Sequence, residues 1–158
     1  MDKQKVGVAR ERLSQKVVNT VEKTSQELFE KAPDELSPRE TGRLGEELAL
    51  GCLKMGGLDF VERNYSCAFG EADLVMRDGD TAVLCEVKTR SEGACGKAMP
   101  PELAVTPHKR QRYGKIARYY YSMHPWVESV RFDVLAVEIK SSRRARCTHF
   151  PNVYMDQP

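Results

Sequence analysis

The sequence contains no apolar run of the roughly 20 residues that are needed to cross a lipid bilayer. Its first residues, MDKQKVGVARER, are polar, and no apolar block of the kind found in secretory signals follows them. Internal repeats and low-complexity stretches are also absent from the sequence. We therefore expect neither membrane association nor export, and we predict a cytoplasmic protein.

The cysteines are scattered along the sequence. The five cysteines are odd in number, and none belongs to a CxxC pair of the kind that zinc sites use. They are Cys52, Cys67, Cys85, Cys95 and Cys147. We expect reduced thiols rather than a disulfide framework or a zinc centre.

The length of 158 residues and the hydrophobic content of 41% suit one domain with its own core. We assign residues 1–37 to an N-terminal amphipathic helix and a linker, and residues 38–154 to a single domain. A helical stripe in the first segment is formed by Leu13, Val17, Val21, Thr24 and Leu28. Two prolines in residues 32–38 end that pattern and predict the linker.

Charge is unevenly distributed, although the net charge is only +2. Residues 1–38 carry 7 basic and 7 acidic side chains, residues 39–105 carry 8 basic and 12 acidic, and residues 106–146 carry 10 basic and 3 acidic. An acidic centre beside a basic segment suits a metal-dependent enzyme that acts on a phosphate polymer, because carboxylates hold cations and basic groups hold phosphates. A charged run can equally be only a solvated face, so this pattern does not decide function alone.

Local signals predict the order helix, three strands, helix, and one or two strands. Ser37, Pro38 and Glu40 form a capping box with proline at the first helical position, which predicts a helix over residues 38–55. Three β-prone runs follow, at 58–65, 72–77 and 81–90, and Asp78-Gly79-Asp80 predicts a tight hairpin between the last two.

The second half of the sequence contains similar local signals for a loop, a helix and strands. Residues 91–105 predict a loop, and Thr106 followed by Pro107 predicts a helix that runs to residue 123. Residues 129–140 predict a strand, residues 141–146 a basic turn, and residues 147–154 an edge strand that Pro151 interrupts. An exposed sheet edge would permit pairing in a homodimer, which the sequence leaves open.

Three polar side chains converge in otherwise apolar strands. Alternation along residues 81–90 places Glu86 and Lys88 on one face, and the short hairpin brings Asp73 beside Glu86. Such groups are costly in a half-buried sheet unless they are paired or bind an ion. The alternative to a functional site is a structural ion pair.

Helical wheels add two inward-facing polar residues. In the first core helix Glu46 falls between Leu50 and Leu53 and faces the sheet edge, whereas Glu47 lies with Arg43 on the polar side. In the second core helix Lys109 points inward with Tyr113, Ile116 and Tyr120, and the outer side carries Arg110, Arg112, Lys115 and Arg118. Either inward residue can instead extend harmlessly to the solvent boundary.

Several motifs occur together in one order. They are Gly42-Arg43-Leu44-Gly45-Glu46, Arg63-Asn64-Tyr65, Gly70-Glu71-Ala72-Asp73-Leu74, Glu86-Val87-Lys88-Thr89-Arg90, Lys109 and Arg131-Phe132-Asp133-Val134. This set resembles the YraN family of bacterial proteins, a group of the PD-(D/E)XK nuclease superfamily that is close to archaeal Holliday-junction resolvases. The resemblance covers residues 40–152, with GEAD in place of the more usual GEID.

The resemblance implies an α/β fold with a restriction-endonuclease-like αβββαβ core, in which helices flank a mixed central sheet. It also implies that Asp73, Glu86 and the carbonyl of Val87 ligate Mg²⁺ or Mn²⁺, and that Glu46 binds a second ion or its water. Lys88 would orient or help to deprotonate the attacking water. The implied reaction is hydrolysis of a phosphodiester bond in structured or branched DNA.

The basic residues of the second core helix complete this interpretation. Lys109 would hold the scissile or an adjacent phosphate, while Arg110, Arg112, Lys115 and Arg118 would follow the nucleic-acid backbone. Backbone contacts position a substrate without reading its sequence, so shape rather than base sequence would be recognised.

Two other hypotheses remain beside the nuclease. The small domain can be a nucleic-acid-binding module that retains the core without cutting. Alternatively, the chain can be an adaptor whose N-terminal helix docks on a protein partner through Leu13, Val17, Val21 and Leu28.

Overall fold

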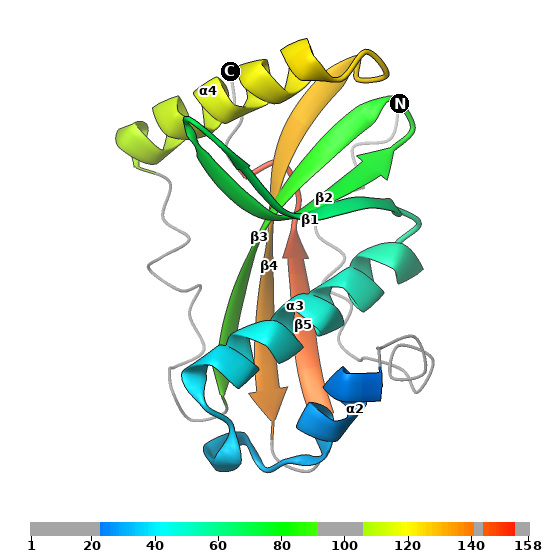
Figure 1. The fold of residues 1–158 in the computed structure, drawn as a ribbon, viewed down its shortest axis with the longest axis vertical. Coiled ribbons are helices and arrows are strands. Elements are labelled where there is room, and N and C mark those ends of the chain that lie inside the picture. The colour runs from blue at the N-terminus through cyan, green and yellow to red at the C-terminus, as the bar shows by residue number, and fades with distance from the viewer. Residues whose placement is uncertain (1–22, 92–105, 141–143, 154–158) are drawn as a thin grey trace, which may run out of the picture.

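The computed structural model describes residues 23–91, 106–140 and 144–153, which form helices around one five-stranded sheet (Figure 1). The elements are α2 (Lys23–Glu30), a 3₁₀ turn η1 (Pro33–Glu35), α3 (Pro38–Met55), β1 (Asp59–Cys67), β2 (Gly70–Asp78), β3 (Thr81–Ser91), α4 (Pro107–Met123), β4 (Ser129–Lys140) and β5 (Arg144–Phe150). The predicted order of elements is confirmed. The predicted loop over 91–105 lies outside the described residues from residue 92 onward.

Both core helices begin where their caps predict. The Glu40 backbone N–H donates to Ser37 Oγ at 3.3 Å, and the Ser37 backbone N–H donates to Glu40 Oε2 at 2.9 Å, which completes the capping box of α3. At α4 the Lys109 backbone N–H donates to Thr106 Oγ1 at 3.2 Å. The predicted bounds of both helices are therefore confirmed.

The strands lie in the order β1-β2-β3-β4-β5. The pairs β1–β2, β2–β3 and β4–β5 are antiparallel, whereas β3 and β4 are parallel. A parallel pair needs a crossover connection, and the segment that contains α4 supplies it. The three predicted β-prone runs form strands whose ends lie within two residues of the predicted ones. The predicted mixed sheet is confirmed.

The C-terminal prediction is wrong in its boundaries. Residues 144–146 belong to β5 rather than to a basic turn, because Lys140 already pairs with Arg144 in the β4–β5 ladder. An edge strand tolerates charged side chains on its exposed face, so Arg144 and Arg146 do not prevent pairing. Pro151 follows the end of β5 instead of interrupting it.

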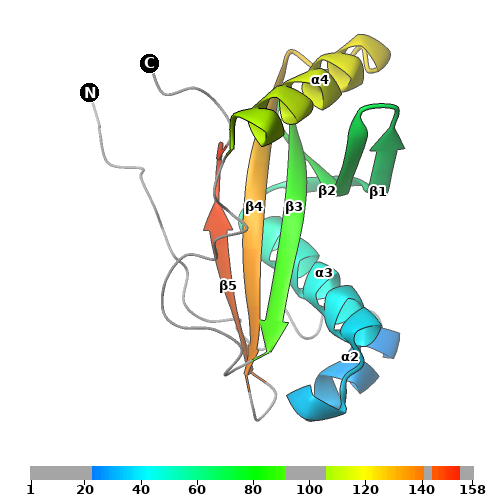
Figure 2. The ribbon, with the colours of Figure 1, turned by 90° about the vertical axis from the view of Figure 1, so that its left-hand side faces the viewer.

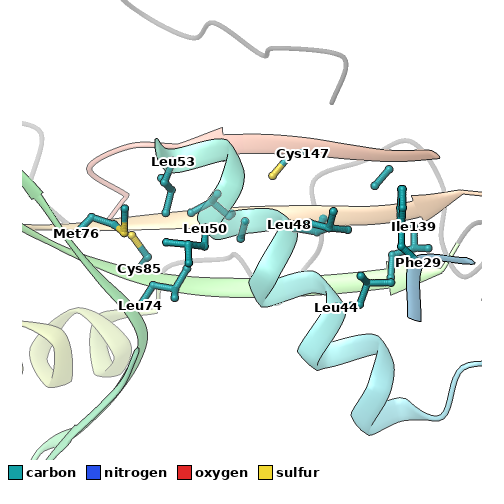
Figure 3. Close-up of a cluster of buried hydrophobic side chains, with 14 of the residues drawn as sticks. Phe29, Leu44, Leu48, Leu50, Leu53, Leu74, Met76, Cys85, Ile139 and Cys147 are labelled. Carbon is teal, nitrogen blue, oxygen red and sulfur yellow. The ribbon is translucent and has the colours of Figure 1, made fainter. Parts of the chain in front are cut away.

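The sheet is covered by two hydrophobic clusters, one on each face. The first lies between α3 and the sheet and includes Leu44, Leu48, Leu53, Val83 and Leu135 (Figure 3). The second lies toward α4 and includes Tyr113, Ile116, Tyr120, Leu84 and Val134. In Figure 2, α2 and α3 lie together on one side of β3, β4 and β5.

The described part of the N-terminal segment joins the first cluster. Leu28 and Phe29 of α2 are buried in it together with Leu36. The stripe residues Leu13, Val17 and Val21 lie outside the described residues. Leu28 contacts the core of its own chain, so the adaptor hypothesis would have to depend on the other stripe residues. The domain boundary at residues 37 and 38 stays a prediction.

One glycine sets the distance between α3 and the sheet. A Cβ at Gly45 would overlap the side chain of Thr89 on β3. By contrast, a Cβ at Gly42 in the same helix would meet no atom within 4 Å. The glycine at position 45 therefore allows α3 to approach β3 closely, immediately before Glu46.

We expect Gly45→Ala to lower the free energy of unfolding by about 1–3 kcal/mol, because the added methyl group forces α3 away from Thr89. Gly42→Ala is the matched control and should be neutral or stabilise by up to about 1 kcal/mol, since alanine favours helix. Urea denaturation of the two variants checks this expectation. Equal effects at the two positions would contradict the close-approach argument.

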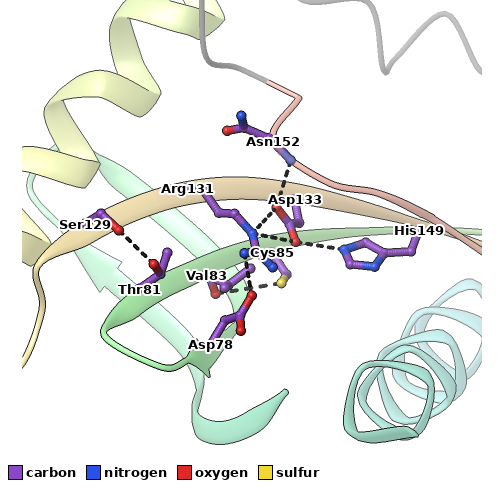
Figure 4. Close-up of polar contacts among 9 residues, drawn as sticks. All are labelled: Asp78, Thr81, Val83, Cys85, Ser129, Arg131, Asp133, His149 and Asn152. Carbon is purple, nitrogen blue, oxygen red and sulfur yellow. Dashed lines mark hydrogen bonds and ion pairs between the residues drawn. The ribbon is translucent and has the colours of Figure 1, made fainter. Parts of the chain in front are cut away.

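A buried carboxylate ties β4 to its neighbours. Asp133 is fully buried and accepts hydrogen bonds from Arg131 Nε at 3.1 Å and from the Asn152 backbone N–H at 2.9 Å, and it pairs with His149 Nε2 at 2.8 Å (Figure 4). Arg131 also pairs with Asp78 Oδ2 at 2.7 Å. Burial raises the pKa of Asp133, but the hydrogen bonds from His149 and Asn152 and the charge of Arg131 lower it further, so the pKa lies below its ordinary value.

Removal of this carboxylate is expected to be costly. We expect Asp133→Ala to destabilise the fold by about 3–5 kcal/mol, because it leaves the Asn152 amide without its acceptor and Arg131 with Asp78 as its remaining acid partner. Asp78→Ala, which removes the half-exposed acid of the same network, should cost less than about 1 kcal/mol. Denaturation curves measure both.

The contribution of Asp133 should also depend on pH. Since its folded pKa is depressed, its stabilisation is present above the ordinary value of 3.8 and is lost as the pH falls through the folded pKa. The difference in stability between wild type and Asp133→Ala should therefore shrink as the pH falls below about 3.8.

Candidate functional site

The side chains of β3 alternate between the two faces of the sheet, as predicted. Val83, Cys85 and Val87 pack into the cluster beneath α3, whereas Leu84 packs toward α4. Glu86 and Lys88 therefore lie on the α4 side. Lys88 Nζ contacts Glu86 Oε1 at 2.6 Å, which confirms that these two residues are neighbours on one face.

Asp73 on β2 is attached directly to the backbone of β3. Its Oδ2 accepts a hydrogen bond from the Val87 backbone N–H at 2.6 Å. Leu74 pairs with Cys85, so Asp73 and Glu86 are the next positions along the two antiparallel strands. The predicted approach of Asp73 to the Glu86-Val87-Lys88 segment is confirmed.

An open cleft of about 430 Å³ lies between the N-terminal half of α3 and the strands. Glu46 and Asp73 both line it, one from the helix and the other from β2. The remaining lining residues are Leu36, Pro38, Thr41, Gly42, Val87, Thr89 and Ser91. Two carboxylates from distant parts of the sequence thus share one hollow.

Both cleft carboxylates are held in conditions that disfavour their charge. Burial is the largest cause that raises the pKa of Asp73, and the charge of Glu86 adds to it, while the bond from Val87 and the charge of Lys88 lower the pKa in part. Burial also raises the pKa of Glu46, followed by the charge of Asp73. The charge of Glu86 thus raises the pKa of Asp73, and the charge of Asp73 raises the pKa of Glu46.

The four predicted catalytic residues are not equally close together. Glu46 and Asp73 line the cleft, whereas Glu86 and Lys88 do not. Among the described residues, no group of three or more His, Cys, Asp or Glu side chains is arranged to hold a metal ion. Asp73 connects the two halves of the site, because its pKa responds to the charges of both Glu86 and Lys88.

The donor set nevertheless suits a hard divalent cation. Carboxylate oxygens and backbone carbonyls are the ligands that Mg²⁺ and Mn²⁺ prefer. Burial, followed by the charges of neighbouring acids, raises the pKa values of Glu46 and Asp73. A cation in the cleft would favour the ionised form of both carboxylates.

Tyr113 on α4 is a site residue that the sequence pattern assigned only to the core. Its hydroxyl donates to Glu86 Oε2 at 2.5 Å. The signal available in the sequence was its position one helical turn after Lys109 on the inward face of α4. Lys109 itself is half-buried in the first turn of α4, and its inward orientation stays a prediction.

Glu47 is a correction to the helical wheel. It was predicted on the polar side of α3, but it is buried and pairs with Arg63 of β1 at 2.5 Å. A wheel describes one helix without its neighbours, and here β1 lies against the side that the wheel left to solvent. Arg63 also lowers the pKa of Glu46, although less than burial and Asp73 raise it.

The outer face of α4 is basic and exposed, as predicted. Its members are Arg110, Arg112, Lys115 and Arg118. A Cβ on Gly70 would meet the Arg112 side chain, so this arginine lies over the β1–β2 turn. Contact of these residues with nucleic acid stays a prediction.

A second basic row lies on β4 and β5 and was missed. Ala145 and Cys147 are buried in the α3-side cluster, so Arg144 and Arg146, which alternate with them along β5, face the side that carries Lys88. Lys140, which pairs with Arg144 across the ladder, extends this row. The sequence contained these residues as a basic run, but only the β5 register shows their common face.

The described helices include none that is long and apolar enough to cross a membrane. Cys52, Cys67, Cys85 and Cys147 are free thiols, while Cys95 lies outside the described residues.

A comparison with known sequences shows which protein family this chain resembles. The model of the family described as "Uncharacterised protein family UPF0102" matches residues 45–137, a span that includes Glu46, Asp73, Glu86, Lys88 and Lys109. A "UPF0102 protein" of Syntrophus aciditrophicus (strain SB) is 44% identical over 101 residues, which cover 63% of this chain and 77% of that protein. A "UPF0102 protein" of Kineococcus radiotolerans is 39% identical over 114 residues, which cover 71% of this chain and 91% of that protein.

We expect Asp73→Asn to stabilise the metal-free protein at about pH 7 by about 0.5–2 kcal/mol, the usual range when a strained functional group is removed. Since the folded pKa of Asp73 is raised, its ionised form costs stability above the ordinary value of 3.8. The gain should disappear below that pH, where the side chain is protonated in both states. Urea denaturation across this pH range measures it.

Asp59→Asn serves as the control for this expectation, because Asp59 is an exposed carboxylate on β1. It should change stability by less than about 0.5 kcal/mol at either pH. A destabilising effect of Asp73→Asn in metal-free protein at neutral pH would contradict the desolvation argument.

Proposed function

The chain belongs to the family described as Uncharacterised protein family UPF0102, and we propose that it is a metal-dependent endonuclease that hydrolyses phosphodiester bonds in structured or branched DNA. One observation carries the proposal. Glu46 and Asp73 line an open cleft as desolvated carboxylates, and Asp73 lies one strand away from the Glu86–Lys88 pair. Such an arrangement costs stability, which is typical of sites that bind an ion.

The architecture supports this proposal. Helix α3, the antiparallel strands β1, β2 and β3, helix α4 and the parallel strand β4 follow the αβββαβ order of the PD-(D/E)XK nucleases that the YraN-type motifs resemble. The residues expected at the acid and lysine positions of that superfamily are here Asp73, Glu86 and Lys88. Fold likeness alone does not define an activity, so the site must carry the argument.

The ion would be held by Asp73, Glu86 and the Val87 carbonyl, with Glu46 on a second ion or its water. Bound there, Mg²⁺ or Mn²⁺ would supply Lewis-acid polarisation of the phosphate and a water of lowered pKa. Asp73 is already fixed for this role by its hydrogen bond from the Val87 backbone N–H.

Lys88 and Tyr113 would act through their contacts with Glu86. The Lys88 ammonium, 2.6 Å from Glu86 Oε1, can orient the attacking water and offset the negative charge that develops on the phosphate. The Tyr113 hydroxyl holds the other oxygen of Glu86 and so fixes its orientation. Hydrolysis adds the water oxygen to phosphorus and releases one ester oxygen, which takes up a proton.

Substrate binding would be electrostatic. Lys109 would hold a phosphate near the site, and the outer face of α4 would follow the backbone. The row formed by Lys140, Arg144 and Arg146, on the same face of the sheet as Lys88, would offer a further phosphate-binding edge. These groups contact backbone rather than base edges, so the proposed enzyme selects shape.

One observation favours a second candidate, a nucleic-acid-binding module that does not cut. Both carboxylate oxygens of Glu86 are already engaged, Oε1 by Lys88 and Oε2 by Tyr113. No three-ligand group is assembled within the described residues. If these contacts persist in the presence of metal, the protein would bind nucleic acid with strong salt dependence and without cleavage.

Cleavage assays distinguish the two candidates. We expect the full chain with Mg²⁺ or Mn²⁺ to cut labelled four-way-junction or flap DNA in preference to linear duplex. Asp73→Asn and Lys88→Ala should each lose about 100-fold or more of this activity while retaining binding, because they remove a metal ligand and a charge-stabilising group.

Matched variants keep this test specific. Asp59→Asn and Lys54→Ala change the same residue types at exposed positions outside the cleft and should retain activity. Salt-sensitive DNA binding by pure wild type, without cleavage under either metal, would replace the endonuclease with the non-catalytic module.

A further inference from the structure

We propose that Phe69 and Tyr119 form a stacking platform for an unpaired base, flanked by Arg112 and Lys115 on α4, and that this platform gives the protein affinity for single-stranded segments of nucleic acid. The inference deepens the proposed function by naming the structural feature of the substrate that is recognised. It uses residues that lie outside the cleft and outside the predicted catalytic set.

Phe69 stands at an unusual place for an aromatic side chain. Cys67 pairs with Gly70, so Ala68 and Phe69 form the two-residue turn between β1 and β2. Such turns normally contain asparagine, aspartate or glycine, whose backbones suit the geometry. A phenylalanine that is 42% exposed at this tip is not explained by turn chemistry or by the core.

Tyr119 meets Phe69 from α4. The ring centroids are 5.8 Å apart at an interplanar angle of 66°, and Tyr119 is 39% exposed. In this edge-to-face arrangement the two rings hold each other in position while part of their surface stays open to solvent. Figure 1 shows the β1–β2 turn reaching α4, which places the pair at the junction of the two elements.

Positive charge lies along the same stripe of α4. Arg112, Lys115 and Tyr119 are spaced by three and four residues, so they follow one another on one side of the helix. Arg112 lies over Gly70, the residue next to Phe69. Both cationic side chains are exposed.

Aromatic rings interleaved with cations fit single-stranded nucleic acid. Bases stack on the rings while the cations hold the phosphates of the same strand, and every base offers a π-face, so binding tolerates sequence. A base inside a duplex cannot reach such a platform without being unpaired. The platform therefore favours the flaps, junction centres and unpaired ends that distinguish branched from linear DNA.

Fluorescence of 2-aminopurine tests the proposal in the full chain without metal, so that cleavage plays no part. A short single-stranded oligonucleotide with one 2-aminopurine is titrated with wild type, Phe69→Leu, Tyr119→Leu and Tyr121→Leu. Leucine keeps apolar bulk but removes the aromatic face. Tyr121 is the control, because it is 54% exposed on α4 and points to another side of the helix.

Wild type and Tyr121→Leu should quench the fluorescence. Phe69→Leu and Tyr119→Leu should lose quenching and bind the single strand about tenfold or more weakly, the range of one lost base stack. Affinity for a matched linear duplex should change less than twofold in all variants. Phe69→Tyr, which restores an aromatic face, should regain the quenching.

Three outcomes would overturn the platform: unchanged quenching in Phe69→Leu, an equal loss in Tyr121→Leu, or an equal loss of duplex binding. Disruption of a dimer by Phe69→Leu with unchanged oligonucleotide binding would assign the pair to a protein contact instead. Thermal denaturation shows that each variant is folded. Absence of cleavage by wild type would count against the endonuclease alone, since stacking is measured without metal.

Discussion

The close approach of α3 to β3 at Gly45 and Thr89 is the constraint on which the candidate site depends. It brings the N-terminal half of α3 against the strands and sets Glu46 across the cleft from Asp73. The same approach removes water from both carboxylates and raises their pKa values. A side chain larger than hydrogen at position 45 would move α3 away from the sheet. Water could then reach Glu46 and Asp73, and the electrostatic conflict between these two carboxylates would weaken.

This electrostatic conflict is local, because the two other buried acids in the described part of the chain are paired. Asp133 is more deeply buried than Asp73, yet its hydrogen bonds and Arg131 keep its pKa low. Glu47, next to Glu46 in sequence, is neutralised by Arg63. The fold therefore can pair its buried acids, and the two that it leaves short of positive charge line the same cleft. That contrast supports the proposed functional role of Glu46 and Asp73 over structural ion pairing.

Much of this arrangement was predictable because it follows from local rules. The capping residues Ser37 and Thr106 predicted where α3 and α4 begin. Alternation along β3 predicted that Glu86 and Lys88 share one face. The failures arose where a second element changes the environment. Glu47 was assigned to solvent because the wheel contained no β1, and residues 144–146 were assigned to a turn because their pairing with β4 is invisible in a charged run. Tyr113 was predicted to face inward. Its hydrogen bond to Glu86 was missed because it joins α4 to β3, and a pattern within one helix does not show contacts with another element.

The sequence by itself determined the order of helices and strands, the family motifs and the residue types available for chemistry. Periodicity and capping depend on neighbours within a few positions, so they can be seen without a structure. Only the tertiary structure decided which acids share a cleft, which are neutralised, and which basic and aromatic side chains of distant elements lie together. Burial, pKa shifts and aromatic contacts depend on atoms that the packing of α3, α4 and the sheet brings together. That packing cannot be predicted from the residues of any one segment alone.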